Sequence, residues 1–370
     1  MPEKIKAFLK SETVLCIAAL CAVISMFFVP PDEAYLHYID FRVLCLLLCL
    51  MAVVAGFKKL GAFDTLTSQL LQKIKNGRTL SAALVLLPFF CSMAVTNDVA
   101  LIVFIPFTLG LLSQLGCNNA AIPMCVLQTV AANLGSMATP VGNPQNLYLY
   151  SEFALLPADF FSVVLPLTAI SLLCLTAASF PVLPKALPQT HLHCTEKGSG
   201  KTYLLYGVLF LLCLLTVFRV VPYPVTTGIV VAVIFVTDRK LLKEIDFMLL
   251  LTFVCFFVVS ENLGRLEIVR TFLQTLLEKN ALLTAIGASQ VISNVPAAIL
   301  LSGFTDNWKA LLAGTNIGGL GTPIASLASL ITLKLYLRAP HVKPGKFLLV
   351  FTAANIIGLC ILISLGLLII

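Results

Sequence analysis

Short polar stretches inside long apolar tracts contain the side chains best suited to bind a solute. In VTNDVALIVFIP (95–106), Thr96, Asn97 and Asp98 stand together, and Asp98 is the only charged residue between Arg78 and Glu152. In ISNVPAAILL (292–301), Ser293 and Asn294 form a similar polar pair. Hydroxyl and amide groups can bind an anion or coordinate a cation. A carboxylate in apolar surroundings is costly, so it is expected to hold a proton, bind a cation or face water.

Two further stretches, TPVGNPQN (139–146) and GGLGTP (318–323), contain residues that end one helix and begin another. Gly142 relaxes the backbone, Asn143 can cap a helix and Pro144 suits its first position, and the residues of GLGTP are expected to play the same parts. The polar residues at 97–98 and 293–294 can cap helices in the same way. A helix N-terminus favours an anion, and the carbonyls freed at a break suit Na⁺.

These features predict one site for an anion and a coupled cation, without Lys or Arg in it. The substrate-binding candidates are Thr96, Asn97, Asn143, Ser293, Asn294 and Thr322. The cation-coupling candidates are Asp98, Asn97, Gly142, Asn146, Asn294, Gly319 and Gly321. We expect no catalytic residue, no cofactor and no metal other than Na⁺ at the coupling residues.

The composition is that of a protein that crosses the membrane many times. Of 370 residues, 59% are hydrophobic and 11% are charged, whereas soluble domains have about 25% charged residues. The net charge of +7 comes from Lys and Arg residues that lie between the apolar runs. This distribution is typical of residues that set the orientation of membrane helices, so we expect no nucleic-acid binding. No HExxH motif and no nucleophile with a base occur in the apolar runs, so we predict no enzyme.

The apolar runs predict an all-α fold with about nine transmembrane helices, since a span needs about 20 residues. Seven uninterrupted spans are expected at about 12–30, 42–57, 160–182, 202–218, 222–237, 246–263 and 347–370. Two interrupted helices are expected at about 120–157 and 308–337, with breaks at TPVGNP and GGLGTP.

Two other apolar tracts, 80–112 and 281–304, are each divided by a polar triplet. The first would be about 50 Å long as one helix, which exceeds a hydrocarbon core of about 30 Å, and its halves are short for separate spans. A re-entrant helical hairpin fits both lengths and places the triplet near mid-membrane. A pair of short tilted spans with the triplet in a surface turn is the alternative.

The chain contains an internal repeat. The segments 39–74 and 245–279 share an IDF start, an apolar span, a Leu-Gly pair and an amphipathic tail, and each is followed by a divided tract and an interrupted helix. We predict a first repeat at 1–183, a cytoplasmic linker at 184–201 and a second repeat at 202–370. Counted along the whole chain, the IDF helix of the first repeat is the second crossing and that of the second repeat is the seventh. One even and one odd number mean opposite orientations, so the repeats are expected to have inverted topology.

The distribution of basic residues predicts the orientation. With a cytoplasmic N-terminus, 18 of the 24 Lys and Arg residues fall on the cytoplasmic side, as the positive-inside rule requires. The C-terminus is then outside, and the two hairpins open from opposite faces so that their tips can meet. Inverted repeats with matching interrupted helices are typical of secondary transporters. We expect an integral protein of a prokaryotic plasma (inner) membrane.

The motifs VTNDVALIVFIPF, TPVGNPQNLYLY, ISNVPAAILL and GGLGTP, in this order, resemble those of the ion transporter superfamily. This superfamily includes citrate and dicarboxylate carriers coupled to sodium, arsenite permeases and sodium/proton antiporters. The resemblance covers most of the chain. It implies inverted repeats with hairpin tips that bind substrate and cation, a scaffold that dimerises, and elevator-type alternating access. Its carboxylate carriers use Ser-Asn-Thr at both tips, whereas the triplet at 96–98 is closer to the arsenite permeases.

The prediction is therefore a secondary active transporter that moves a small anion, a di- or tricarboxylate, coupled to Na⁺ or H⁺. The first alternative is proton-coupled efflux of arsenite or antimonite, or Na⁺/H⁺ antiport, with Asp98 as the proton carrier. An ion channel is a more distant alternative. The expected partners are a small anionic substrate, Na⁺ or H⁺, the lipid bilayer and a second copy in a homodimer, without nucleic acid.

Overall fold

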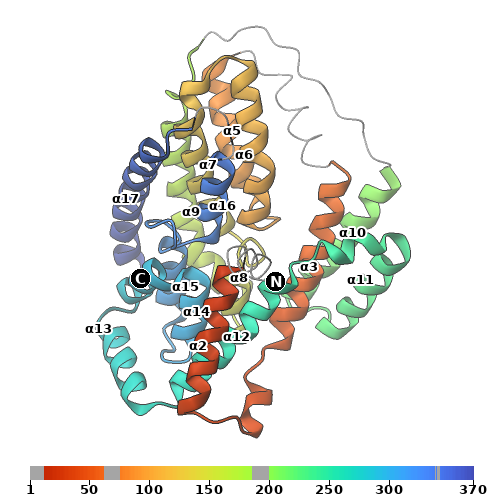
Figure 1. Ribbon diagram of the computed structural model, residues 1–370, viewed down its shortest axis with the longest axis vertical. Helices are drawn as coiled ribbons and strands as arrows, with labels where there is room; N and C mark the ends of the chain where they lie inside the picture. Colours follow the sequence, from red (N-terminus) through yellow and green to blue (C-terminus); the bar gives the residue numbers. More distant parts are fainter. Residues whose placement is uncertain (1–11, 62–75, 186–199, 338, 340–341) are drawn as a thin grey trace, which may run out of the picture.

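The computed structural model describes residues 12–61, 76–185, 200–337, 339 and 342–370, and every regular element in these ranges is a helix (Figure 1). Six helices are long and apolar enough to cross a membrane: α3 (Phe41–Lys59), α6 (Asn97–Gln114), α9 (Pro157–Ser179), α10 (Gly200–Val217), α12 (Phe247–Gly264) and α17 (Pro344–Ile369). Shorter apolar helices are α2 (Thr13–Phe28), α5 (Gly77–Cys91), α11 (Tyr223–Thr237) and α16 (Leu327–Leu337). The predicted all-α fold with apolar spans is confirmed.

The two divided tracts each fold as a pair of helices. The first tract forms α5 and α6, and the second forms the end of α13 (Glu267–Ile292) and α14 (Asn294–Ser302). Asn280 has non-helical φ and ψ of −164° and 96°, so the arm that leads to the second tip starts at Ala281. We refer to α5–α6 as hairpin 1 and to 281–302 as hairpin 2.

The two interrupted helices are also present. The first consists of α7 (Ala121–Ser136) and α8 (Pro144–Glu152), and the second of α15 (Trp308–Ile317) and α16. We refer to residues 137–143 as break 1 and to residues 318–326 as break 2. Both breaks fall where Pro and Gly predicted them. The predicted linker at 184–201 lies mostly outside the described residues.

Side-chain helix caps are present at the IDF helices, whereas the caps predicted at the breaks and tips are not formed. The carboxylates of Asp40 and Asp246 accept from the N–H groups of Val43 and Leu249, at 3.0 and 2.8 Å, as an N-cap should. The residues that precede α6, α8 and α14 make no side-chain cap hydrogen bond. The helix after GLGTP starts only at Leu327, so the expectation that Gly321, Thr322 and Pro323 begin it is wrong. The polar groups at the breaks are instead engaged in tertiary hydrogen bonds, described below.

The helices form two groups. Figure 1 shows α5, α6, α7 and α9 as a bundle, against which α16 and α17 pack, with α13, α14 and α15 below it. The group of α3, α10 and α11 lies beside this bundle. Helix α2 packs mainly on α12, and α11 packs on α3, so each sequence half contributes a helix to the other half's IDF helix.

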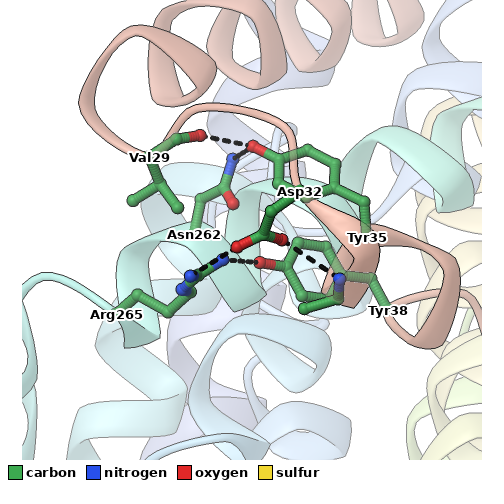
Figure 2. A network of polar contacts seen from close by, with 7 residues as sticks. Val29, Asp32, Tyr35, Tyr38, Asn262 and Arg265 are labelled. Atoms are coloured by element: carbon green, nitrogen blue, oxygen red, sulfur yellow. Dashed lines mark hydrogen bonds and ion pairs between the residues drawn. The ribbon is translucent and has the colours of Figure 1, made fainter.

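A polar network joins the end of α2 to the end of α12 (Figure 2). The buried amide of Asn262 donates to the hydroxyls of Ser25 and Tyr35, at 2.9 and 2.8 Å. At the surface, Arg265 donates to the carboxylate of Asp32 at 2.7 Å, and this contact holds the pKa of Asp32 below its usual range. A lowered aspartate pKa adds stability that is present at neutral pH and is lost as the pH falls through the lowered value. Both charged side chains are exposed, so this contribution is small.

Close packing of hairpin 1 on α7 depends on Gly135. A Cβ atom at this position would lie 2.1 Å from the carbonyl oxygen of Phe89 in α5. We expect Gly135→Ala to destabilise the protein by about 1–3 kcal/mol, since backbone atoms must move to make room. Gly228→Ala in α11 is the matched control, because its Cβ would meet nothing within 4 Å. Thermal unfolding in detergent should show a lower midpoint for the first variant only, and equal midpoints would contradict the prediction.

Candidate functional site

Each hairpin tip is bonded to the break in its own half of the chain. The N–H of Asn97, at the start of α6, donates to the carbonyl of Gly142 at 3.3 Å, and the N–H of Asn294, at the start of α14, donates to the carbonyl of Ala325 at 3.0 Å. Gly142 and Ala325 each lie three residues after the threonine of a Thr-Pro pair. The same backbone contact therefore occurs at both tips.

A threonine hydroxyl makes a second matched contact at each tip. Thr139 donates to the carbonyl of Met93, and Thr322 donates to the carbonyl of Gln290 at 3.1 Å. Met93 and Gln290 each lie four residues before the tip asparagine. The hydroxyl proton of Thr322, a predicted substrate ligand, is thus used to join hairpin 2 to break 2, and this side chain is exposed.

Asn133, buried at the end of α7, connects the first tip to break 2. Its Oδ1 accepts from the side-chain amide of Asn97 at 2.9 Å and from the hydroxyl of Ser326 at 3.0 Å. Its Nδ2 donates to the carbonyl of Gly319 at 3.4 Å. A residue of the first half therefore holds the break of the second half.

Asn316, buried at the end of α15, makes the reciprocal connection to break 1. Its Nδ2 donates to Oδ1 of Asn146 at 2.6 Å and to the carbonyl of Leu312 at 2.7 Å. Its Oδ1 accepts from Nδ2 of Asn143 at 3.5 Å. The two exchanges place both tips and both breaks in one buried polar cluster.

Asn133 and Asn316 are absent from the predicted site, although the sequence contains a signal for them. NLGSMATP (133–140) and NIGGLGTP (316–323) match at the asparagine, the following glycine and the Thr-Pro pair. In this register Thr139 corresponds to Thr322. The same polar residue, at the same distance from both Thr-Pro pairs, is the signal that could have identified Asn133 and Asn316 as site residues.

Asp98 lies beside this cluster without joining it. Its backbone N–H donates to Oδ1 of Asn97 at 2.9 Å, while its own Oδ1 is enclosed and has no hydrogen-bond partner. Oδ1 of Asn143, at the end of break 1, and Nε2 of Gln145, in the first turn of α8, are also enclosed and have no hydrogen-bond partner. Buried polar atoms without partners are uncommon, and each of these three atoms can form a hydrogen bond when a proton, water or ligand binds there.

The other predicted site residues make contacts of different kinds. Ser293 is buried and donates weakly to the carbonyl of Ala325 at 3.3 Å, so it belongs to the cluster. The carbonyls of Gly142 and Gly319 already receive N–H groups, and the N–H of Gly321 donates to Oδ1 of Asn355 at 3.1 Å. Thr96 is half-buried at the tip and makes no side-chain cap bond.

The arrangement suits recognition of a small polar solute. The N-termini of α6, α8, α14 and α16 all adjoin the cluster, and such termini offer N–H groups and a partial positive charge. Among the described residues of the tips and breaks there is no Lys or Arg. A bound anion would therefore depend on helix dipoles, hydroxyls and amides. Within the described ranges, no three His, Cys, Asp or Glu side chains converge as a metal site.

Comparison with protein families identifies relatives across most of the chain. The family model described as Citrate transporter matches residues 5–307. The uncharacterized transporter MJ0456 of Methanocaldococcus jannaschii is 32% identical over 90% of this chain and 91% of its own length. The inner membrane protein YbiR of Escherichia coli is 31% identical over 84% of both chains. The silicon efflux transporter LSI3 of rice (Oryza sativa subsp. japonica) is 33% identical over 40% of this chain and 30% of its own.

A solved structure has the same fold. The crystal structure of the YdaH transporter of Alcanivorax borkumensis, described as having an unusual topology, aligns with a TM-score of 0.55 at 14% identity. The alignment covers 90% of this chain and 87% of that one. At this identity the likeness concerns the fold alone.

Proposed function

This chain belongs to the citrate transporter family of membrane transport proteins, and we propose that it is a secondary active transporter that moves a small anion, a di- or tricarboxylate, coupled to Na⁺ or H⁺. The family and the relatives are transporters rather than enzymes. The substrate class and the coupling are our proposal.

The observation that carries this proposal is the single polar cluster in which both tips and both breaks meet. Its asparagines are buried in an otherwise apolar protein, and it has atoms without partners that a solute or proton could satisfy. Secondary transporters place their site where interrupted helices meet at a repeat interface. The matched hydrogen bonds at the two tips support two repeats of one architecture, and we propose their boundaries at 1–183 and 202–370.

Uptake into proteoliposomes tests the function. Labelled succinate and citrate would be offered with an imposed Na⁺ gradient, with an imposed proton gradient and with neither. Gradient-dependent accumulation of either acid is expected. Absence of uptake under every gradient, with folded protein in the vesicles, would contradict a carboxylate carrier and favour the second candidate described below.

Alanine variants of the tip asparagines test the site. We expect Asn97→Ala and Asn294→Ala to reduce uptake about 10- to 100-fold, which corresponds to about 1.5–3 kcal/mol for a hydrogen bond to a charged group. Asn262→Ala is the control, because Asn262 is an equally buried amide in the α2–α12 network. Wild-type uptake in both tip variants would exclude this cluster as the substrate site.

A second candidate is proton-coupled efflux of a weakly acidic oxyacid such as arsenite or antimonite, or Na⁺/H⁺ antiport. Asp98 favours it, because a carboxylate beside a site without cationic side chains repels a dianion. The partial similarity to a silicon efflux transporter agrees with a hydroxyl-rich solute. Efflux of arsenite and of silicic acid from preloaded vesicles, measured with and without a proton gradient, distinguishes this candidate from carboxylate uptake.

We further propose the orientation and the motion of the protein. The ion pairs Lys59–Asp238 and Asp32–Arg265 each join residues that a cytoplasmic N-terminus and an external C-terminus place on the same side of the membrane. This agreement supports the predicted order of the crossings, and the distribution of the basic residues leads us to propose the cytoplasmic N-terminus, in a prokaryotic inner membrane. In an elevator-type mechanism, the two hairpins and the helices packed on them would move against α3, α10 and α11 together with α2 and α12, and these five helices would dimerise.

A further inference from the structure

A proline in hairpin 1 leaves one backbone carbonyl without its helical partner. Pro88 lies inside α5, four residues after Leu84. Proline has no N–H group, so the carbonyl of Leu84 cannot receive the hydrogen bond that an α-helix normally supplies. Both residues are buried, and a buried carbonyl without a partner is costly. The donor for this carbonyl has to come from another element.

Gln128 of α7 supplies this donor and also bonds the second arm of the hairpin. Its Nε2 donates to the carbonyl of Leu84 in α5 and to Oγ1 of Thr108 in α6, at 2.8 Å each. Gln128, Leu84 and Thr108 are all fully buried. The amide nitrogen has two N–H groups, so one can serve each arm. A single side chain therefore ties both arms of hairpin 1 to α7, the helix that lies beside them in Figure 1.

The amide of Gln128 cannot turn over without losing these contacts. A flip would place its Oε1 against the carbonyl oxygen of Leu84, and two acceptors repel each other. In the present orientation Oε1 is enclosed and has no hydrogen-bond partner. An unpartnered buried oxygen costs free energy, so Gln128 adds less stability than its two hydrogen bonds suggest. The main consequence of the arrangement is the placement of both arms on one helix.

The same helix also receives the tip of hairpin 1. Asn133, five residues after Gln128 in α7, accepts from the side-chain amide of Asn97 at 2.9 Å. Thr108 lies eleven residues after Asn97, which is about 16 Å along a helix that rises about 1.5 Å per residue. Gln128 therefore acts on the tip through the arms, at a distance. A tilt of either arm at the level of Gln128 is amplified at the tip.

The corresponding position beside hairpin 2 is apolar. With NLGSMATP matched to NIGGLGTP, Asn133 corresponds to Asn316, and Gln128 corresponds to Leu311 in α15. Leu311 is fully buried, and its side chain has no donor for an arm of hairpin 2. The amide at this position therefore distinguishes the first half of the chain from the second, and Leu311 offers a matched control.

We propose that Gln128 is a positioning residue of the transport site: by holding both arms of hairpin 1 on α7, it fixes the place of Asn97 in the polar cluster. This inference rests on the proposed function, in which Asn97 binds the substrate. Without Gln128 the hairpin would still form, because α5 and α6 pack on each other and on α7. Its tip would occupy a range of positions, and substrate would bind more weakly because binding would have to order the tip.

Uptake kinetics give the first test. Gln128→Met keeps the length of the side chain and removes both donors, whereas Thr108→Val removes only the contact with α6. We expect the concentration of succinate or citrate for half-maximal uptake to rise about tenfold in Gln128→Met and about threefold in Thr108→Val, with a maximal rate within about twofold of the wild type. Leu311→Met should change neither quantity. An unchanged half-maximal concentration in folded Gln128→Met would overturn the proposal.

A Pro88→Ala background separates positioning from the mere satisfaction of the Leu84 carbonyl. The alanine supplies an N–H four residues after Leu84, so this carbonyl no longer needs Gln128. In this background, Gln128→Met is expected to leave the unfolding midpoint within about 2 °C and still to raise the half-maximal concentration about tenfold. If the concentration does not rise, Gln128 has a structural role only and the proposal is wrong. If Gln128→Met alone does not fold, this background and Thr108→Val decide.

Hydrogen exchange of backbone amides tests the inference without a substrate. In Gln128→Met, the amides at the tip of hairpin 1 (92–98) are expected to exchange at least about tenfold faster, while those at the tip of hairpin 2 (289–294) keep their rate. Equal acceleration at both tips, or none at either, would contradict a local positioning role. If the wild-type protein transports neither acid, the proposed function fails, while the exchange comparison still decides the role of Gln128.

Discussion

Asp98→Asn is expected to abolish accumulation of substrate against a gradient while leaving the fold intact. Asparagine has nearly the same shape as aspartate but cannot carry a proton, and the Oδ1 of Asp98 has no hydrogen bond to lose. With one coupled proton, a pH difference of two units can support an accumulation of about 100-fold, since about 1.4 kcal/mol corresponds to a factor of ten. Without the proton, the concentration ratio should fall to about 1.

Counterflow and a matched control make this experiment specific. Exchange of labelled for unlabelled substrate, which needs no coupling, should persist in Asp98→Asn, and so should the unfolding midpoint. Asp159→Asn removes a carboxylate from the first turn of another helix, α9, and should accumulate substrate like the wild type. Undiminished accumulation by Asp98→Asn, with the membrane potential held at zero, would show that the proton is carried elsewhere or not at all.

Asn316→Ala is expected to have the second large effect, because it disconnects the two halves at break 1. The change leaves Nδ2 of Asn143 and Oδ1 of Asn146 without their partner, and each unsatisfied buried group costs about 1–3 kcal/mol. Asn146 would also lose the contact that orients it toward the carbonyls of its own break. We expect transport to fall at least about tenfold and the unfolding midpoint to decrease.

The loss of transport must be separated from the loss of stability. Asn262→Ala removes a buried amide with two hydrogen bonds and should lower the midpoint without a comparable loss of transport. Asn133→Ala should resemble Asn316→Ala, and the double variant should lose less than the sum of the two, because residues in one network are not additive. Strict additivity would show that the two contacts act independently, and normal transport by the folded Asn316 variant would show that the reciprocal exchange has no role in the cycle.

The helices and their interruptions could be predicted from the sequence because they depend on near neighbours. Apolar length defines α9 and α17, and Asp40 and Asp246 cap their helices within three residues. Pro and Gly mark both breaks, since proline lacks an N–H and glycine tolerates unusual backbone angles. The family resemblance, drawn from the same motifs, agrees with the family match over residues 5–307.

The prediction failed where a local rule competed with tertiary contacts. Asn143 is placed as a cap before α8, yet its side chain donates to Asn316 instead. GLGTP has the composition of a helix start, but Gln290 and Asn355 engage its N–H groups and α16 begins later. An amide can satisfy a local or a distant partner at similar cost, so composition alone does not decide between them.

An all-helical membrane protein, the positions of its breaks and the polar residues at its two tips follow from the amino-acid sequence alone. Which of these residues meet depends on the tertiary structure. The bonds from Asn143 to Asn316 and from Ser326 to Asn133 join residues 173 and 193 positions apart, and their existence depends on how the two halves pack. Hydropathy and helix punctuation are local properties, whereas the partner of a buried amide is a property of the whole fold.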